Sequence, residues 1–187
     1  MNIFYIDRDP YKAAEQMVDK HVVKMILETA QLLSTAHRLL DGEEYVGQSK
    51  TGRKAKRWRL PDEREDILYS ATHINHPSAV WCRQSNNNYT WLFCHFMGLL
   101  AEYTYRYGKE HKCSAPEFVD ALSRPPHKIR VGHCTPVTPA MAEEYLVKDH
   151  GVPDSLKSYR NYYKHGKVHL HKWTKREMPE WMKCQNP

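Results

Sequence analysis

The sequence lacks several features that would assign it to a special class of protein. No apolar run approaches the roughly 18 residues that a membrane-spanning helix needs, and residues 1–10 lack the basic-then-apolar pattern of a signal peptide. The five cysteines are widely spaced and include no CxxC pair, which argues against a disulfide framework and against a thiolate zinc site. We therefore expect an intracellular, cytoplasmic protein with reduced cysteines and no membrane contact.

The composition is that of a globular protein with an excess of positive charge. The chain has 187 residues, of which 41% are hydrophobic and 27% charged, and this length suits a single domain over 1–187. The net charge is +6 with histidine neutral, which favours polyanionic partners. Basic residues cluster at 50–59 and again at 157–183, where tyrosine and tryptophan are interleaved with them.

The apolar pattern predicts an all-α, mainly helical fold. Apolar residues recur at helical spacing from the Asp9-Pro10 start to the Asp41-Gly42 stop, and again over about 77–108. We expect a compact bundle built on these two long helices, with a short N-terminal extended arm at 2–6. The other expected segments are short helices at 61–72, 115–122 and 139–150, a basic mobile loop at 43–60, a long loop at 123–139, and a basic aromatic tail at 154–187 that is helical to about 176.

Three ionisable residues interrupt the apolar pattern of the first helix. His21 and Glu28 are seven residues apart, which places them on one face at about 20° from each other, with Lys24 between them. One interpretation is a helix edge stabilised by an internal Lys24–Glu28 pair. The other is a general acid/base pair, because burial can raise the pKa of a glutamic acid and a histidine titrates near neutrality.

Three further groups of residues are candidates for contact with DNA. Amides and a free helix start can bind base edges and phosphates, basic residues neutralise phosphates, and aromatic rings stack on bases. The alternative for each group is an ordinary solvated or packed surface. The candidates are Asn75, His76, Arg83, Gln84 and Asn88 at the second long helix, Tyr159, Arg160, Tyr162, Tyr163, Lys164 and Lys167 in the tail, and Arg53, Lys54 and Arg57 in the basic loop.

Several of these motifs, taken in order, resemble a known family. The pattern Asp19-x-His21-x6-Glu28, the pattern Asn75-His76-Pro77-x3-Trp81, a helix that ends at Tyr107-Gly108 and a tyrosine-rich basic tail are similar to the pyrimidine-dimer DNA glycosylases of the phage endonuclease V type. The resemblance covers residues 13–32, 73–113 and 156–167.

The resemblance implies an all-helical DNA repair enzyme that binds double-stranded DNA and needs neither metal nor cofactor. The N-terminal amine of this family attacks C1′ of a damaged nucleotide and forms an imine. A first-helix glutamate, here Glu28, assists sugar opening and strand cleavage, and His21 helps to position the substrate. Family members begin Met-Thr, whereas this chain begins Met1-Asn2. The nucleophile is then the Met1 amine, the Asn2 amine after removal of Met1, or Lys20 or Lys24.

Three functions follow from these observations. The first is a glycosylase and lyase that acts on damaged or modified pyrimidines, and therefore also an endonuclease. The second is a base- or nucleotide-modifying enzyme on the same scaffold, in which Lys24 and Glu28 serve a transfer reaction. The third is a non-catalytic DNA-binding protein, in which the basic loop and tail account for the activity.

Overall fold

A computed structural model describes residues 1–48 and 51–183. Lys50 of the basic cluster and Cys184 lie outside the described residues. The predicted helix start at Asp9 is confirmed, since the Asp9 carboxylate accepts the backbone N–H groups of Tyr11 and Lys12 and Pro10 is the first helical residue. The helix is divided into α1 (Pro10–Glu15) and α2 (Asp19–Asp41). At the break the N–H of Val18 donates to the Tyr163 hydroxyl and that of Asp19 to the Lys172 carbonyl.

The second long helix is also divided, into α4 (Pro77–Cys82) and α5 (Asn86–Tyr107). Ser85 has extended backbone angles and its hydroxyl accepts the N–H of Asn88, so it caps a new helix instead of continuing the old one. The same hydroxyl donates to the His133 carbonyl, which ties this break to the loop after α6 (Pro116–Ser123). Gly108 ends α5 at φ 66°, where a residue without a side chain is favoured.

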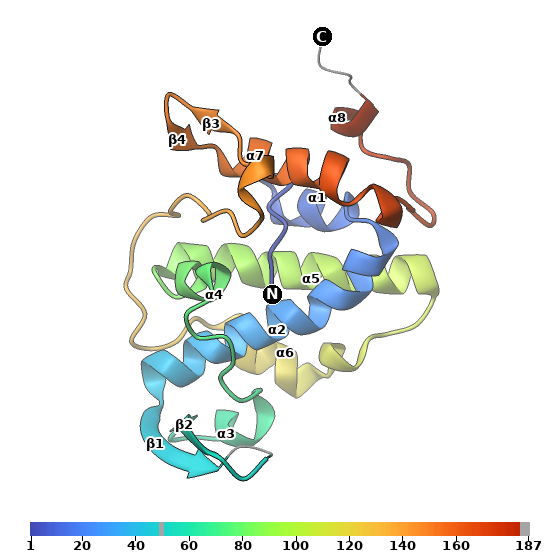
Figure 1. The fold of residues 1–187 in the computed structure, drawn as a ribbon. Helices are drawn as coiled ribbons and strands as arrows, with labels where there is room; N and C mark the ends of the chain where they lie inside the picture. Colours follow the sequence, from blue (N-terminus) through green and yellow to red (C-terminus); the bar gives the residue numbers. More distant parts are fainter. Residues whose placement is uncertain (49–50, 184–187) are drawn as a thin grey trace.

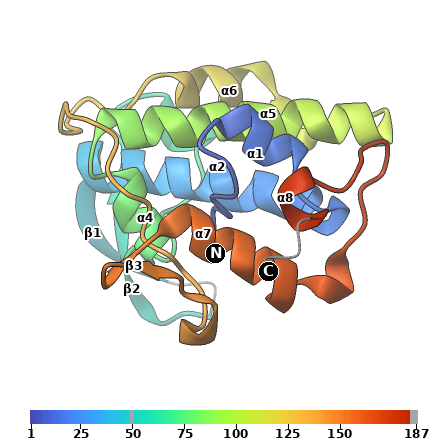
Figure 2. The same cartoon turned by 90° about the horizontal axis from the view of Figure 1, so that it is seen from above.

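The two long helices α2 and α5 lie side by side and form the centre of the molecule (Figures 1 and 2). α1 packs against α5, and α6 lies on the opposite side of the α2–α5 layer from α7 (Ser155–Asn161) and the N-terminus. The core includes the fully buried side chains of Trp81, Tyr89, Phe96, Tyr159 and Tyr163. No helix within residues 1–48 and 51–183 is both long and apolar enough to cross a membrane.

The all-α prediction is wrong, because the fold is mixed and contains two small antiparallel sheets. Of the described residues 52% are helical and 9% are in strands, and only four of the eight α-helices have seven or more residues. β1 (Glu43–Gln48) pairs with β2 (Lys54–Arg59), and β3 (Lys148–Asp149) pairs with β4 (Val152–Pro153). The expected basic mobile loop is therefore a paired hairpin, which was missed because both of its faces carry polar residues.

Several shorter elements also differ from the prediction. The helix expected at 61–72 is a single turn, α3 (Arg64–Ile67), and the one expected at 139–150 is replaced by a 3-10 turn (Glu143–Tyr145) and β3. The tail helix ends early: α7 passes into a π-helical turn (Tyr162–Gly166) and a 3-10 turn (Val168–Leu170), and α8 (Glu180–Lys183) follows. The expected loop at 123–139 contains no helix or strand beyond Ser123.

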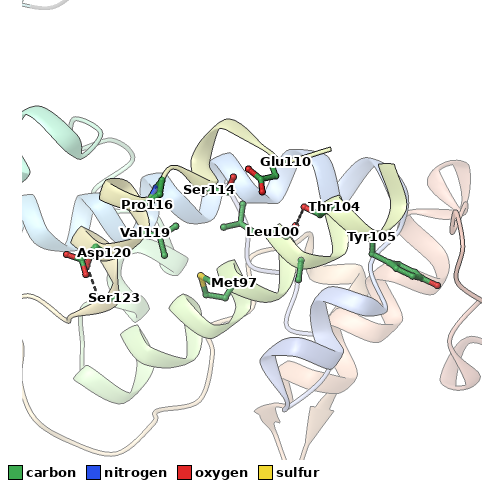
Figure 3. A pocket seen from close by; sticks show the side chains of 11 residues that line it. Met97, Leu100, Thr104, Tyr105, Glu110, Ser114, Pro116, Val119, Asp120 and Ser123 are labelled. Carbon is green, nitrogen blue, oxygen red and sulfur yellow. Dashed lines mark hydrogen bonds between the residues drawn. The ribbon is translucent and has the colours of Figure 1, made fainter. Parts of the chain in front are cut away.

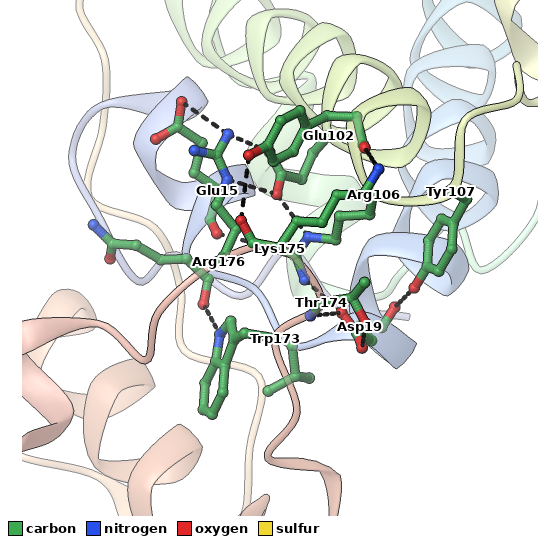
Figure 4. Close-up of polar contacts among 12 residues, drawn as sticks. Glu15, Asp19, Glu102, Arg106, Tyr107, Trp173, Thr174, Lys175 and Arg176 are labelled. Atoms are coloured by element: carbon green, nitrogen blue, oxygen red, sulfur yellow. Dashed lines mark hydrogen bonds and ion pairs between the residues drawn. The ribbon is translucent and has the colours of Figure 1, made fainter.

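Buried ion pairs attach the tail to the long helices (Figure 4). The Arg106 side chain is fully buried and donates to Asp19 at 2.9 Å and to Glu102 at 2.6 Å. Thr174 donates its N–H and its hydroxyl to Asp19, and Arg176 donates to Glu102. Burial opposes ionisation of Asp19, but these hydrogen bonds outweigh it and hold its pKa below the usual value. Asp19, the first residue of the family-like motif, is therefore a structural anchor.

Candidate active site

The N-terminal arm is locked into the core by the side chain of Asn2. Its Oδ1 accepts the backbone N–H groups of Ile3 at 2.8 Å and Phe4 at 3.1 Å, and its Nδ2 donates to the Ala140 carbonyl at 2.8 Å. Phe4 has a φ of 52°, an uncommon conformation for a residue with a side chain. Since Asn2, Ile3 and Phe4 are all buried, the backbone nitrogens at the start of the chain have fixed positions.

These nitrogens lie against the carboxylate of Glu28. Glu28 Oε2 accepts the N–H of Asn2 at 3.0 Å and lies 3.8 Å from the Met1 ammonium, while Oε1 lies 3.3 Å from Lys24 Nζ. The Glu28 side chain is 14% exposed, whereas that of Lys24 is 69% exposed. The pairing of Lys24 with Glu28 is therefore present, but Glu28 is not on a solvated helix surface. Glu28 is a largely buried carboxylate that lies next to the N-terminal amine.

His21 is neutral, which corrects the expectation that it titrates near pH 7. Burial, together with the positive charges of Lys167, Lys24 and His169, lowers its pKa to about 3. Its Nδ1 lies 2.7 Å from the hydroxyl of Tyr163, which also accepts the N–H of Val18. Because this buried hydroxyl needs an acceptor, it donates to Nδ1, and the imidazole proton is on Nε2. The His21 ring stacks on that of Phe4 with the ring centroids 4.1 Å apart, so its orientation is fixed.

The start of α4 belongs to the same site. His76 is the N-cap of α4, and its Nδ1 accepts the N–H of Ser78 at 3.2 Å, which leaves Nε2 as the protonated nitrogen. Partial burial, the N-terminal ammonium and His73 lower the pKa of His76, while Glu28 opposes them. The start of α4 therefore lies beside the Glu28 carboxylate and the N-terminal amine, whereas His21 lies about two turns of α2 before Glu28, against Phe4 and Tyr163.

The remaining residues predicted near α4 are divided between surface and core. Asn75 and Gln84 are exposed, but Asn88 is fully buried and holds Trp81 and Thr135 with its amide, so it cannot bind a base edge. Arg83 is half-buried, and its Nη1 is a buried nitrogen without a hydrogen-bond partner in the described chain. Burial lowers the pKa of this guanidinium. An anion beside Arg83 would remove that cost.

The tail does not present the expected row of aromatic rings. Tyr159 and Tyr163 are fully buried core residues, and Arg160 donates to the Ile6 carbonyl and pairs with Asp7. Tyr162, Lys164 and Lys167 are half-buried. The Tyr162 ring lies between Phe4 and Tyr145, with Lys167 Nζ 4.7 Å from its centroid. Tyr145 was not among the residues predicted to contact DNA, because its segment was expected to be an ordinary helix.

Arg53, Lys54 and Arg57 are brought together on the β1–β2 hairpin, away from Glu28. Lys54 and Arg57 belong to β2, and Arg53 directly precedes it. Lys20, an alternative nucleophile, is exposed at the start of α2. Within the described ranges, no group of three or more His, Cys, Asp or Glu could hold a metal ion.

A large groove lies elsewhere on the molecule. A groove of about 850 Å³ separates α5 from α6 and is lined by apolar side chains such as Met97, Leu100 and Val119 (Figure 3). None of the predicted site residues lines it. Size alone would select this groove as a ligand site, but its lining offers no amine and no histidine, so the candidate site is the cluster at Glu28.

Comparison with known proteins assigns no relative: no family model matches the chain, and neither the curated proteins nor the solved structures contain a significant match.

Proposed function

We propose that the protein is a DNA glycosylase and lyase that acts on damaged or modified pyrimidines in duplex DNA, with the amine at the start of the chain as nucleophile. One observation carries this proposal: Glu28 Oε2 lies 3.0 Å from the Asn2 nitrogen and 3.8 Å from the Met1 amine. If Met1 is retained its amine is beside the carboxylate, and if Met1 is removed the Asn2 nitrogen becomes that amine.

The chemistry needs an unprotonated amine and a group that moves protons. Glu28 accepts a proton from the ammonium, and the free amine attacks C1′ while the bond from C1′ to the base breaks. The base leaves with the bonding electron pair and takes up a proton. The bond from C1′ to O4′ then breaks, an imine forms between C1′ and the nitrogen, and O4′ receives a proton from Glu28. The Glu28 carboxylate then accepts a C2′ proton, the C3′–O bond breaks, and the 3′ phosphate leaves with the bonding electron pair, which cleaves the strand.

The surroundings of Glu28 fit a sugar–phosphate substrate. Lys24 is exposed beside the carboxylate, His76 presents an N–H donor at the start of α4, and the net charge of +6 favours a polyanion. Damaged or modified nucleotides must leave the base stack before an enzyme can reach C1′, and damage lowers the cost of that extrusion. The site needs only to hold an extruded sugar near the amine.

The test is reduction of the imine on defined DNA. The protein is incubated with a duplex that contains one abasic site and with a duplex that contains one cyclobutane dimer, and borohydride is added. We expect a covalent protein–DNA adduct with at least one of them, and strand cleavage when borohydride is omitted. Absence of both with both substrates would contradict the proposal. A change in the mass of a base without an adduct would indicate the base-modifying enzyme. Binding of DNA without any reaction would indicate a non-catalytic DNA-binding protein.

A further inference from the structure

The β1–β2 hairpin is a strongly basic element that is exposed on both faces. Its described residues carry five cations, Arg53, Lys54, Lys56, Arg57 and Arg59, against two carboxylates, Glu43 and Glu44. Lys54, Lys56 and Arg59 are exposed, and so is Val46, with 69% of its surface accessible. Neither face of this hairpin is covered by the core, whereas most antiparallel sheets pack one face against a core.

The hairpin depends on contacts at its base. A two-stranded hairpin is at best marginally stable in water, and the contacts within this one are surface contacts. They include a Lys56–Glu44 ion pair at 2.8 Å and Arg59 over the ring of Tyr45 at 5.0 Å. Exposed pairs of this kind contribute little, so a rigid attachment must hold the hairpin in place.

That attachment comes from two buried arginines. Arg38 of α2 is 4% exposed and donates to the carbonyls of Trp58 at 3.0 Å, Tyr69 at 3.0 Å and Leu68 at 2.8 Å, and it pairs with the Glu65 carboxylate. That carboxylate also accepts the N–H of Leu60 at 2.8 Å.

The second arginine, Arg64, joins the turn after the hairpin to the end of α2. It pairs with Asp41 at 2.7 Å and Asp62 at 2.6 Å, and it donates to His37 Nδ1 at 2.8 Å. The direction of the hairpin is therefore fixed relative to α2, the helix that also carries Glu28.

The hairpin and the candidate site both lie along α2. Figure 2 shows the hairpin and the N-terminus on the same side of that helix, and Figure 1 shows the hairpin below the end of α2 and the N-terminus above it. From Glu28 to Asp41 the axis of α2 rises about 20 Å, at about 1.5 Å per residue. A duplex that passes over Glu28 and reaches the hairpin base spans about six base pairs, at about 3.4 Å per pair.

We propose that the β1–β2 hairpin is a distal clamp on duplex DNA, which neutralises backbone phosphates about six base pairs or more from the reacting nucleotide and on one side of it only. This inference rests on the proposed function, since it places the reacting nucleotide at Glu28. The partner is assigned by charge complementarity: a ribbon that carries five cations fits a polyanion, and a two-stranded ribbon has the width of a DNA groove.

The experiment combines a hairpin variant with DNA arms of different length. The variant is Lys54→Gln with Arg57→Gln, and the matched control is Lys109→Gln with Lys112→Gln, two exposed lysines that do not belong to the hairpin. Affinity is measured against salt on three duplexes with one abasic site: two long arms, the 5′ arm cut to about three base pairs, or the 3′ arm so cut. Melting temperatures and circular dichroism establish that each variant folds.

We expect the hairpin variant to lower the log–log salt slope on the long duplex by about 2, since each phosphate contact contributes about 0.9. The control should leave the slope unchanged. Shortening one of the two arms should lower the wild-type slope and abolish the difference between wild type and variant, while shortening the other arm should do neither. Equal slopes for wild type and variant on the long duplex, or a difference that survives both shortenings, would overturn the clamp.

The same duplexes separate this inference from the proposed function. Borohydride trapping of the wild-type protein on the duplex with the short hairpin-side arm reports the chemistry at Glu28 without any hairpin contact. An adduct there, together with unaltered slopes in the variant, rejects the clamp and keeps the glycosylase. No adduct on any duplex rejects the glycosylase and, with it, the assignment of the reacting nucleotide to Glu28 on which the clamp depends.

Discussion

At the scale of single residues, the account depends on Glu28 and on what surrounds it. Its carboxylate receives the Asn2 N–H and lies near the Met1 and Lys24 amines. An exposed Lys–Glu pair on a helix contributes a few tenths of a kcal/mol to stability and has no effect on a reaction. An acid/base group is worth far more to a reaction rate than to stability, so the two interpretations differ in what a single substitution does.

Glu28→Gln keeps the shape of the side chain and removes the titratable proton. We expect single-turnover strand cleavage of abasic DNA to fall by about 10² to 10⁴, with DNA affinity and melting temperature nearly unchanged. Lys24→Gln is the matched control: it breaks the same ion pair and leaves the carboxylate in place. Cleavage at the normal rate in the Glu28 variant, or an equal loss of cleavage rate in both variants, would show that Glu28 only pairs with Lys24.

Arg83 offers a second test at this scale. Arg83 is half-buried and one of its guanidinium nitrogens has no hydrogen-bond partner in the described chain, which is unfavourable unless an anion pairs with the guanidinium group. We expect Arg83→Gln to lower the salt slope of DNA binding by about 0.9 and to leave the melting temperature equal or higher. A lower melting temperature with unchanged DNA binding would make Arg83 a purely structural residue.

At the scale of elements, the tail from α7 onward is a structural strap as well as a basic surface. Its buried tyrosines, Tyr159 and Tyr163, close the core over α2, and Thr174 and Arg176 attach it to Asp19 and Glu102. Tyr162, which lies between Tyr159 and Tyr163 in the sequence, is half-buried and lies against Phe4 at the edge of the site. The helical spacing of this segment is compatible with either side facing the core, which is why the sequence could not assign its aromatic residues.

The neighbouring tyrosines Tyr162 and Tyr163 should therefore respond differently to loss of the hydroxyl. Tyr163→Phe leaves the buried Val18 N–H and His21 Nδ1 without their partner, so we expect the free energy of unfolding to fall by about 1–3 kcal/mol. Tyr162→Phe should change it by less than about 0.5 kcal/mol. Denaturant unfolding of both variants measures this, and equal values would remove the distinction between core and surface in the tail.

The helix boundaries that sequence analysis found are those with a local physical cause. Asp9 and Pro10 start α1, Asp41 and Gly42 end α2, and His76 and Pro77 start α4, because caps act through the nearest backbone groups. The length of the first helix suggested a kink or break, but the positions of the breaks at 16–18 and 83–85 were not found, since they depend on Tyr163, Lys172 and His133, which are remote in sequence. The hairpin was not found, because its stability comes from Arg38 and Arg64 rather than from an apolar face.

The site was predicted in part for a similar reason. Helical spacing placed His21, Lys24 and Glu28 on one face, but only the family resemblance connected Glu28 with the start of the chain. Helical spacing could not predict that His76 lies near Glu28. It also could not predict that Asn88 and Tyr159 are buried, since the burial of these two residues depends on how the loop at 124–142 packs.

At the scale of the whole molecule, burial of histidines makes stability depend on pH. Burial is the main cause that lowers the pKa of His21 to about 3 and the pKa values of His37 and His95 to about 4. In the unfolded chain these groups titrate near 6.5. Below that pH the unfolded chain binds protons that the folded chain does not, so stability present above about pH 6.5 is lost as pH falls toward 4.

We expect the free energy of unfolding to decrease between pH 6.5 and pH 4.5 by up to about 1.4 kcal/mol per pH unit for each of the three histidines. A His95→Gln variant should lose about a third of that slope. Urea unfolding at several pH values provides the measurement. A free energy that is constant over this range would mean that these histidines are protonated in the folded protein.

The central claim is that the amine at the start of the chain attacks DNA beside Glu28, and peptide mapping of the reduced adduct tests it most directly. The protein is trapped on abasic DNA with borohydride, the DNA and protein are digested, and the modified residue is identified by mass spectrometry. The account predicts the sugar remnant on the α-nitrogen of the N-terminal residue, Met1 or Asn2. A remnant on Lys20 or Lys24, or no covalent adduct at all, would contradict it.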